Sequence, residues 1–156
     1  MASHVKTLIC SILLIAAARA EAQSVGDKVD VGNLHFSALP AQILSPGRCG
    51  LFLWSKSDRP VFVLFATEAP AQATVRLDGR TRQLKRASTS GQPIYGHFEK
   101  QTFTDNTATF EVDLTYDRSK AVQDGAVIEQ GVLRATDKNG FEAILPVGGM
   151  IGCKKA

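Results

Sequence analysis

The chain of 156 residues has few of the side chains that most often carry out chemistry, with three cysteines, three histidines and one tryptophan. It contains no Gly-x-Ser-x-Gly nucleophile elbow, no His-Glu-x-x-His zinc motif and no Gly-rich phosphate loop. No Cys-x-x-Cys or Cys/His spacing suits a zinc ion. We therefore expect a protein that is not an enzyme and that uses neither a metal nor a cofactor.

The sequence also lacks an apolar run of the roughly 20 residues that span a bilayer. Its most apolar stretch, Thr7–Ala18, follows a short basic lead and precedes Ala-x-Ala sites ending at Ala20 and Ala22. This order is typical of a secretory signal peptide. We expect residues 1–22 to be removed, the protein to be periplasmic or secreted, and the remaining chain to have no transmembrane segment.

A strong excess of either charge is missing as well. The net charge of the chain is +3, and loss of residues 1–22 removes Lys6, Arg19 and Glu21 and leaves +2. Because nucleic-acid-binding domains usually carry a strong basic patch, no nucleic-acid partner is expected. Residues 23–156 have the length of one domain, with a core expected over about residues 42–153.

The cysteines become a single pair once the signal peptide is removed. Only Cys49 and Cys153 remain, and an even number in an exported chain indicates a disulfide. The bond would close a loop of about 100 residues, for which chain entropy gives on the order of 4–5 kcal/mol of stabilisation.

Two-residue alternation, typical of β-strands, is what the sequence has in abundance. Ala108–Tyr116 alternates cleanly and places Phe110, Val112 and Leu114 on the face expected to be buried. No segment has a 3.6-residue period over the length of a helix. Short strands with turn signals roughly every 8–12 residues predict an all-β fold, a small antiparallel β-barrel or sandwich of about eight strands.

Local signals refine this expectation at three places. Asp78-Gly79 lies between two alternating segments and predicts a two-residue hairpin turn, because both turn positions need a positive φ. We expect one strand around Val29–Phe36. Ser119–Gly125 has the composition of a single helical turn.

The segment after this hairpin turn is basic and then small and polar. Its charges, including Arg82 and Lys85, are explained by a strand edge that resists aggregation. A strand edge does not explain the small polar loop expected at Ala87–Pro93. Loops held on a β scaffold often bind partners. We expect Ser88–Tyr95 to contact a protein with an acidic cleft, because neighbouring basic side chains would steer such a cleft toward it.

The segment Ala73–Gly96, ATVRLDGRTRQLKRASTSGQPIYG, resembles the central part of the periplasmic inhibitors of c-type lysozyme. The common pattern is an apolar strand, a short turn, a strand ending in leucine and a Ser-Gly loop ending in tyrosine. The resemblance implies a small antiparallel barrel whose disulfide joins an early strand to the C-terminal end. It also implies that Ser90, Gly91 and Tyr95 match the family's loop, whose serine enters the lysozyme cleft and hydrogen-bonds a catalytic carboxylic acid.

Three departures separate this chain from that family, and one of them is that this chain is longer before Cys49. Three residues lie between Gly91 and Tyr95, where the family has two. The family's second motif supplies an aromatic residue and then a lysine, whereas here Phe103 is followed by Asp105 near the lysine position. An acid there would repel the catalytic acids of lysozyme.

The leading expectation is an exported binding protein of this kind, but two other classes remain. One is a barrel that encloses a small apolar ligand, which would have small residues inside and an open mouth near Trp54. Trp54 is otherwise expected to be a core aromatic residue. The other is a structural or assembly partner in the cell envelope that docks by an exposed strand edge. An alternative surface is the row Tyr95, His97 and Glu99, which strand alternation would place on one face. The residues predicted to bind the partner are Arg82, Lys85, Ser88, Ser90, Gly91 and Tyr95.

Overall fold

The computed structural model describes the backbone of residues 26–156 and the side chains of all of these except 118–121. The expected signal peptide, residues 1–22, lies outside the described residues. Between residues 26 and 156 the chain forms ten strands in one antiparallel sheet. They are β1 (Lys28–Val31), β2 (Leu34–Ser37), β3 (Cys49–Ser55), β4 (Phe62–Glu68), β5 (Ala71–Leu77), β6 (Arg80–Ile94), β7 (His97–Thr104), β8 (Ala108–Val122), β9 (Gly125–Asp137) and β10 (Glu142–Cys153).

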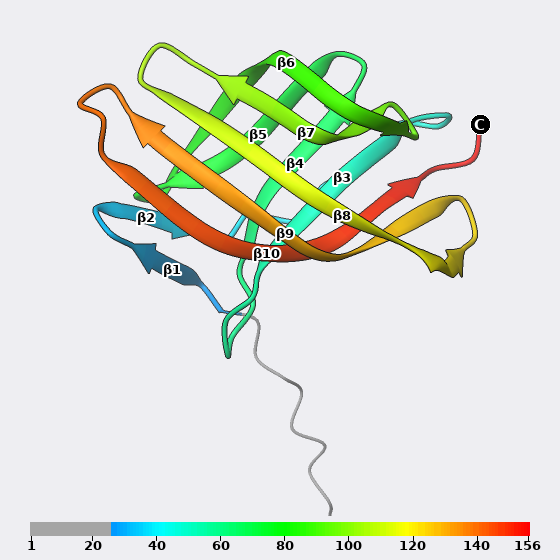
Figure 1. Ribbon diagram of the computed structural model, residues 1–156, viewed down its shortest axis with the longest axis horizontal. Coiled ribbons are helices and arrows are strands. Elements are labelled where there is room, and N and C mark those ends of the chain that lie inside the picture. The colour runs from blue at the N-terminus through cyan, green and yellow to red at the C-terminus, as the bar shows by residue number, and fades with distance from the viewer. Residues whose placement is uncertain (1–25) are drawn as a thin grey trace, which may run out of the picture.

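Eight of these strands, β3–β10, close into a barrel (Figure 1). Their order is β5-β4-β3-β10-β9-β8-β7-β6, and pairing of β6 with β5 completes the ring. The two extra strands, β1 and β2, join the edge of β5 where Phe36 pairs with Leu77. The all-β prediction is confirmed, and the barrel rather than the sandwich is correct. None of the described residues belongs to a helix that is long and apolar enough to cross a membrane.

The barrel interior is filled by apolar side chains, as in other barrels of eight strands. Phe110, Val112 and Leu114 point inward and are at most 3% exposed, which confirms the predicted face of β8. The interior also takes in several large side chains from other strands. They include Leu51, Leu53, Leu64, Leu84, Phe103 and Leu133.

The hairpin turn at Asp78-Gly79 is confirmed. Both residues have a positive φ, 50° and 73°, and the flanking strands pair in the expected register with Leu77 opposite Arg80. The turn is held against the N-terminal hairpin β1–β2, because Asp78 N donates to His35 O at 2.9 Å and Gly79 N to Ser37 Oγ at 3.0 Å.

Three local predictions are wrong, in each case because cross-strand pairing extends further than the residue types indicated. The single strand around Val29–Phe36 is a hairpin, with β1 and β2 on either side of a turn at Gly32. The helical turn at Ser119–Gly125 is instead the end of the β8–β9 hairpin, where Val122 pairs with Gly125. The loop at Ala87–Pro93 is part of β6 and pairs with β7.

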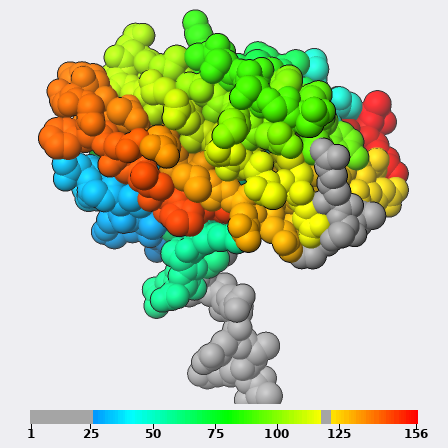
Figure 2. Space-filling view, in the orientation of Figure 1, coloured from blue at the N-terminus to red at the C-terminus, as the bar shows by residue number. Residues whose placement is uncertain are grey.

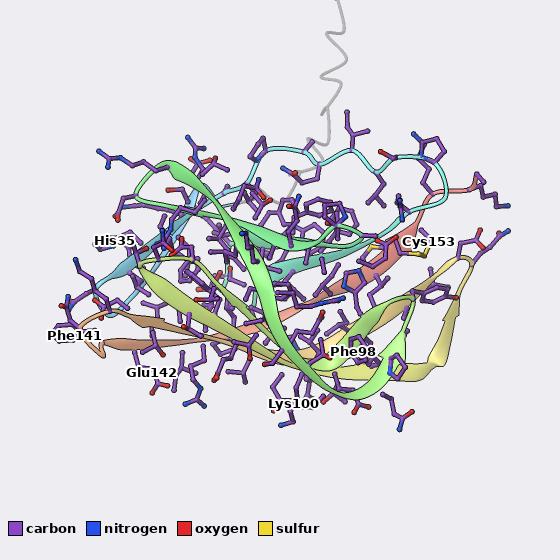
Figure 3. The ribbon with its side chains drawn as sticks, turned by 90° about the horizontal axis from the view of Figure 1, so that it is seen from above. His35, Phe98, Lys100, Phe141, Glu142 and Cys153 are labelled. Carbon is purple, nitrogen blue, oxygen red and sulfur yellow. A yellow bond between two sulfur atoms is a disulfide. The ribbon has the colours of Figure 1, made fainter. Side chains whose placement is uncertain are left out.

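The predicted disulfide Cys49–Cys153 is present and joins neighbouring strands β3 and β10. The two Cα atoms are 4.0 Å apart. Seen from above, Cys153 lies at one end of the molecule, and His35 and Phe141 lie at the opposite end (Figure 3). The space-filling view places the N-terminal hairpin below the β9–β10 turn at that opposite end (Figure 2). At one end of the molecule the disulfide joins residues that are distant in the sequence, and at the other end the N-terminal hairpin is bonded to the Asp78-Gly79 turn.

Candidate functional site

The outer half of β6 leaves its neighbour β5 but stays in the sheet with β7. Pairing with β5 runs from Arg80 to Lys85 and stops there, whereas pairing with β7 continues to Ile94. The seven residues from 87 to 93 are all exposed. This part of β6 consequently has one edge that no strand of the described chain covers.

Two β-bulges decide which side chains of β6 face outward. Ala87 is an extra residue between Arg86 and Ser88, and a second extra residue lies between Ser90 and Pro93. A bulge reverses the alternation that follows it. Ser88 and Ser90 therefore pair with Thr102 and Lys100, which line an outer groove of the barrel, and lie on that outer face.

Gly91 lies in the second bulge with φ 83°, in the region that favours glycine. A Cβ at this position would come within 2.5 Å of Glu99 Oε2. The same carboxylate accepts a hydrogen bond from Gln92 N at 3.2 Å. Glycine is thus the residue that lets β6 bulge directly over the Glu99 side chain.

Tyr95 and Gly96 form the two-residue turn between β6 and β7, with φ values of 51° and 77°. The Tyr95 side chain is 46% exposed at the tip of the hairpin. This turn replaces the longer Ser-Gly loop expected from the sequence. It places Tyr95 beyond the strip of exposed residues rather than beside Ser90.

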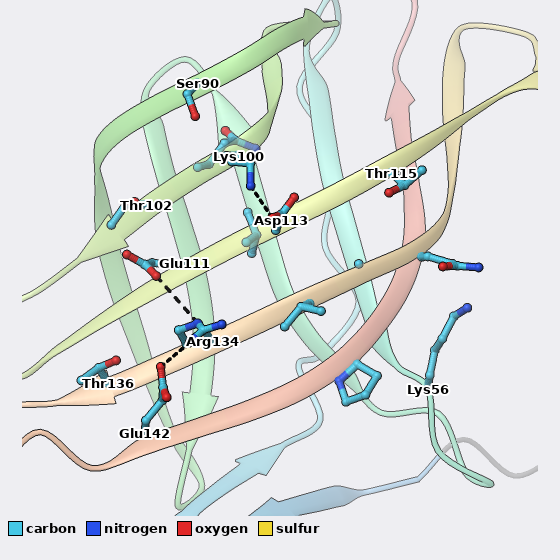
Figure 4. A pocket seen from close by; sticks show the side chains of 16 residues that line it. Lys56, Ser90, Lys100, Thr102, Glu111, Asp113, Thr115, Arg134, Thr136 and Glu142 are labelled. Carbon is cyan, nitrogen blue, oxygen red and sulfur yellow. Dashed lines mark hydrogen bonds and ion pairs between the residues drawn. The ribbon is translucent and has the colours of Figure 1, made fainter.

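The outer groove runs from Ser90 across β7, β8, β9 and β10 and has a volume of about 1010 Å³ (Figure 4). Threonines and charged side chains dominate its wall. Lys100 Nζ donates to Asp113 Oδ2 at 2.5 Å. Arg134 Nη1 donates to Glu142 Oε1 at 2.7 Å, and this hydrogen bond raises the pKa of Arg134 above its ordinary value. The groove is therefore polar, with most of its charges paired.

Two basic residues are predicted to lie beside the site. Lys85 is exposed, whereas Arg82 is half-buried. Arg82 faces inward next to Leu84 and forms an ion pair with Asp105, with each side chain less than a quarter exposed. Its guanidinium also lies 5.8 Å from the centre of the Phe110 ring. Arg82 therefore joins β6 to the β7–β8 turn instead of facing a partner.

The alternative row of Tyr95, His97 and Glu99 does not form one face. His97 is completely buried, whereas Tyr95 is at the exposed turn. Among the described residues, neither ring nitrogen of His97 has a hydrogen-bond partner at normal geometry. Burial lowers the pKa of His97 to about 4, against smaller opposing effects of the Cys49 backbone and the Glu68 carboxylate. The imidazole is accordingly neutral at physiological pH and shielded from a substrate.

Sequence reasoning missed the buried polar group that surrounds this histidine. Gln101 is 2% exposed, and its Oε1 accepts a hydrogen bond from Arg86 at 3.2 Å. Arg86 also donates to Gly96 O at 3.0 Å. No sequence motif predicts this cluster, because Arg86 and Gln101 become neighbours only when β6 pairs with β7.

Trp54 lies on the outer face of β3 and stacks on Phe62 with ring centres 4.9 Å apart. It does not stand at the mouth of the barrel interior, so that expectation is wrong. In the part of the chain with described side chains, no group of three or more His, Cys, Asp or Glu residues is placed to hold a metal ion.

No protein family, characterised protein or solved structure matches this chain.

Proposed function

We propose that this chain is an exported, non-enzymatic binding protein that recognises a protein partner through the end of its β6–β7 hairpin. The observation that carries this function is the run of seven exposed residues, 87–93, on a strand that has left β5. The strip is held in place by its pairing with β7, while its other edge is free of β5. The resemblance to lysozyme inhibitors makes a c-type lysozyme the partner of choice.

The chemistry of the strip suits a narrow polar cleft. Ser88 and Ser90 offer hydroxyl groups on the outer face, and Gly91 adds no side-chain bulk. A hydroxyl that donates to an ionised carboxylate makes a strong hydrogen bond. Lys85, which is exposed at the base of the strip, adds a positive charge that attracts an acidic cleft.

The acid that departs from the inhibitor pattern, Asp105, is neutralised within the protein. Arg82 donates to it with two nitrogen atoms, at 2.8 and 2.6 Å. A carboxylate paired in this way presents little net charge to a partner. The expected repulsion of the lysozyme acids is therefore offset.

An assembly partner that adds a strand to the free edge of β6 is a second candidate, favoured by the missing β5 pairing beyond Lys85. The two bulges oppose it, because bulges interrupt the regular ladder that an added strand needs. A ligand inside the barrel is disfavoured, because the interior is occupied by core side chains.

The test is lysozyme turnover measured against increasing amounts of the wild-type protein and of Ser90→Ala. Loss of one hydrogen bond to a charged group costs about 1.5–3 kcal/mol, so inhibition should weaken roughly 10- to 150-fold. Ser45→Ala is the matched control, since Ser45 is exposed in a different loop. Its inhibition should equal that of the wild type.

Absence of inhibition by the wild-type protein at micromolar concentration would rule out the lysozyme version. Inhibition that survives Ser90→Ala would place the contact elsewhere. A pull-down from envelope extract with and without added lysozyme, using the wild type and Ser90→Ala, then separates lysozyme from an assembly partner.

A further inference from the structure

A second hollow lies on the outside of β3, β4 and β10, with a volume of about 670 Å³. It shares no lining residue with the outer groove that runs from Ser90 to β10. Its floor consists of Phe52, Trp54 and Phe62, whose rings are within 18–24° of parallel and whose centres are 4.9–6.3 Å apart. Phe52 and Trp54 point outward because they alternate along β3 with the inward residues Leu51 and Leu53. Phe62 lies on the same face because it pairs with Trp54 across the ladder. Phe62 is 7% exposed and belongs to a second hydrophobic cluster with Leu39 and Phe65, so solvent reaches this floor mainly at the half-buried Phe52 and Trp54.

A missing side chain makes room beside these rings. Gly152 on β10 has an ordinary strand φ, and a Cβ there would meet only Met150 Cε at 3.7 Å and Phe52 Cε2 at 3.9 Å. Those distances are normal van der Waals contacts, so a larger residue would project into the hollow without distorting the backbone. Met150 is 38% exposed along the same wall. The volume of the hollow is therefore within the range of small-molecule sites, roughly 300–1,000 Å³.

Among the described residues that line the hollow, Lys154 is the one basic residue. It lies at one end of the hollow, and its backbone is fixed by hydrogen bonds with Gly47 at 2.8 Å and Arg48 at 2.9 Å. It forms no ion pair with any residue whose side chain is described. The acid at this end, Asp124, is instead paired with Lys155 at 3.7 Å. An anionic group would therefore find an available cation next to an apolar floor.

We propose that this hollow binds an amphiphilic molecule with an apolar body and an anionic head, such as a fatty acid. The body lies over Phe52, Trp54 and Phe62, where it removes apolar surface from water. The head pairs with Lys154. A quaternary ammonium ligand fits poorly, because Lys154 repels it and because near-parallel rings do not enclose a cation as an aromatic cage does. This site is separate from the β6–β7 strip, so its failure leaves the proposed function unaffected.

Trp54 gives a direct readout, because it is the one tryptophan of the chain and lies in the floor of the hollow. The purified protein is titrated with dodecanoate below its micelle concentration while Trp54 emission is recorded, and calorimetry gives the affinity. Dodecanol and dodecyltrimethylammonium serve as neutral and cationic probes of the same chain length. We expect dodecanoate to bind most tightly and the ammonium probe least.

Lys154→Gln tests the head-group contact. Since exposed ion pairs contribute little, its affinity for dodecanoate should fall about two- to fivefold, with dodecanol binding unchanged. Lys138→Gln, in the exposed β9–β10 turn, is the matched control and should bind like the wild type. A Lys154→Gln protein that loses affinity equally for both probes would overturn the assigned head-group position.

Gly152→Val tests the hollow itself. The added side chain should lower the affinity for every probe more than tenfold, while the circular dichroism spectrum and melting temperature stay near wild type. Met150→Trp also adds bulk to the wall of the hollow and replaces Gly152→Val as the test if that variant does not fold. Thr136→Val, in the outer groove, is the control and should retain binding. The inference is overturned if no probe changes Trp54 emission at submillimolar concentration, or if both filling variants bind normally. It is also overturned if emission depends on protein concentration alone, which would mean that a second copy covers the hollow.

Discussion

Arg82 and Asp105, which are 23 residues apart in the sequence, form a bidentate ion pair. Arg82 Nε donates to Asp105 Oδ2 at 2.8 Å, and Nη2 donates to Oδ1 at 2.6 Å. Asp105 also accepts hydrogen bonds from Thr107 N at 2.7 Å and Ala108 N at 3.0 Å. One carboxylate thereby holds the β7–β8 turn in shape and fastens it to β6. The strand that closes the barrel is anchored at the point where its outer half begins to diverge.

The Arg82–Asp105 ion pair predicts that the wild type is more stable than Asp105→Asn, and that this difference disappears in acid. Burial pushes the pKa of Asp105 upward, but hydrogen bonds from Arg82, Thr107 and Ala108 outweigh it and lower the pKa from 3.8 to about 2. The stabilisation is therefore present above pH 3.8 and is lost as the pH falls through 2. Asp105→Asn should lower the free energy of unfolding by about 1 kcal/mol at pH 6, after allowance for solvent screening.

Urea unfolding at pH 6 and pH 2 measures this difference. Asp58→Asn in the exposed β3–β4 turn is the control and should behave like the wild type at both pH values. If the gap between wild type and Asp105→Asn is as large at pH 2 as at pH 6, the charged pair is not its source.

The buried His97 predicts a second, separate pH dependence. Its pKa is lowered from 6.5 to about 4 by burial, so the unfolded chain binds a proton between these values while the folded chain does not. Stability should therefore fall as the pH drops from 6.5 to 4, by at most about 3 kcal/mol. His97→Leu should remove this loss, because no imidazole remains to be protonated on unfolding.

Urea midpoints at intervals between pH 7 and pH 4 test the role of His97. Asn33→Leu, a change to leucine in the exposed β1–β2 turn, should retain the wild-type profile. A wild-type midpoint that stays constant across this range would contradict the assignment.

The alternation of β8 predicts opposite outcomes for adjacent faces. Val112 is 1% exposed inside the barrel, and Val112→Asp should unfold the protein because an unpaired buried carboxylate is very costly. Thr109 points to the outer face, and Thr109→Asp should change the free energy of unfolding by less than about 1 kcal/mol. Circular dichroism and melting temperature distinguish the two, and equal effects would mean that the strand is turned the other way.

Export and the disulfide can be checked on one sample. We expect mass spectrometry of the exported protein to give an N-terminus near Glu21 or Gln23 and no thiol that alkylates before reduction. Replacing both Cys49 and Cys153 by serine should lower the free energy of unfolding by about 2–5 kcal/mol, because the unfolded chain regains its freedom. An intact Met1 or two reactive thiols would contradict the exported, oxidised state.

Features that depend on neighbours in sequence were predictable. The inward face of β8 follows from its alternation, since successive side chains of a strand point to opposite sides. The Asp78-Gly79 turn follows from the positive φ that both positions need. The partner of Cys49 follows from the expectation that Cys10 lies in a signal peptide, which leaves Cys153 as the other cysteine. Each of these needs only a few residues or a count.

The candidate site was predictable in part. Ser88, Ser90 and Tyr95 are exposed as expected, but the loop that was to carry them is a strand. Small polar residues have low β propensity, and here pairing with β7 overrides it.

What the sequence by itself determined is therefore the β alternation, the tight turn and the cysteine pair. Only the tertiary structure decided which way the remaining side chains face. The bulge at Ala87 turns Ser88 outward, barrel closure brings Arg82 to Asp105, and the hairpin end buries His97. Trp54 likewise faces the hollow rather than the interior, because it alternates along β3 with the inward Leu53. These orientations depend on one-residue shifts between strands, and a shift of one residue moves every later side chain to the other face.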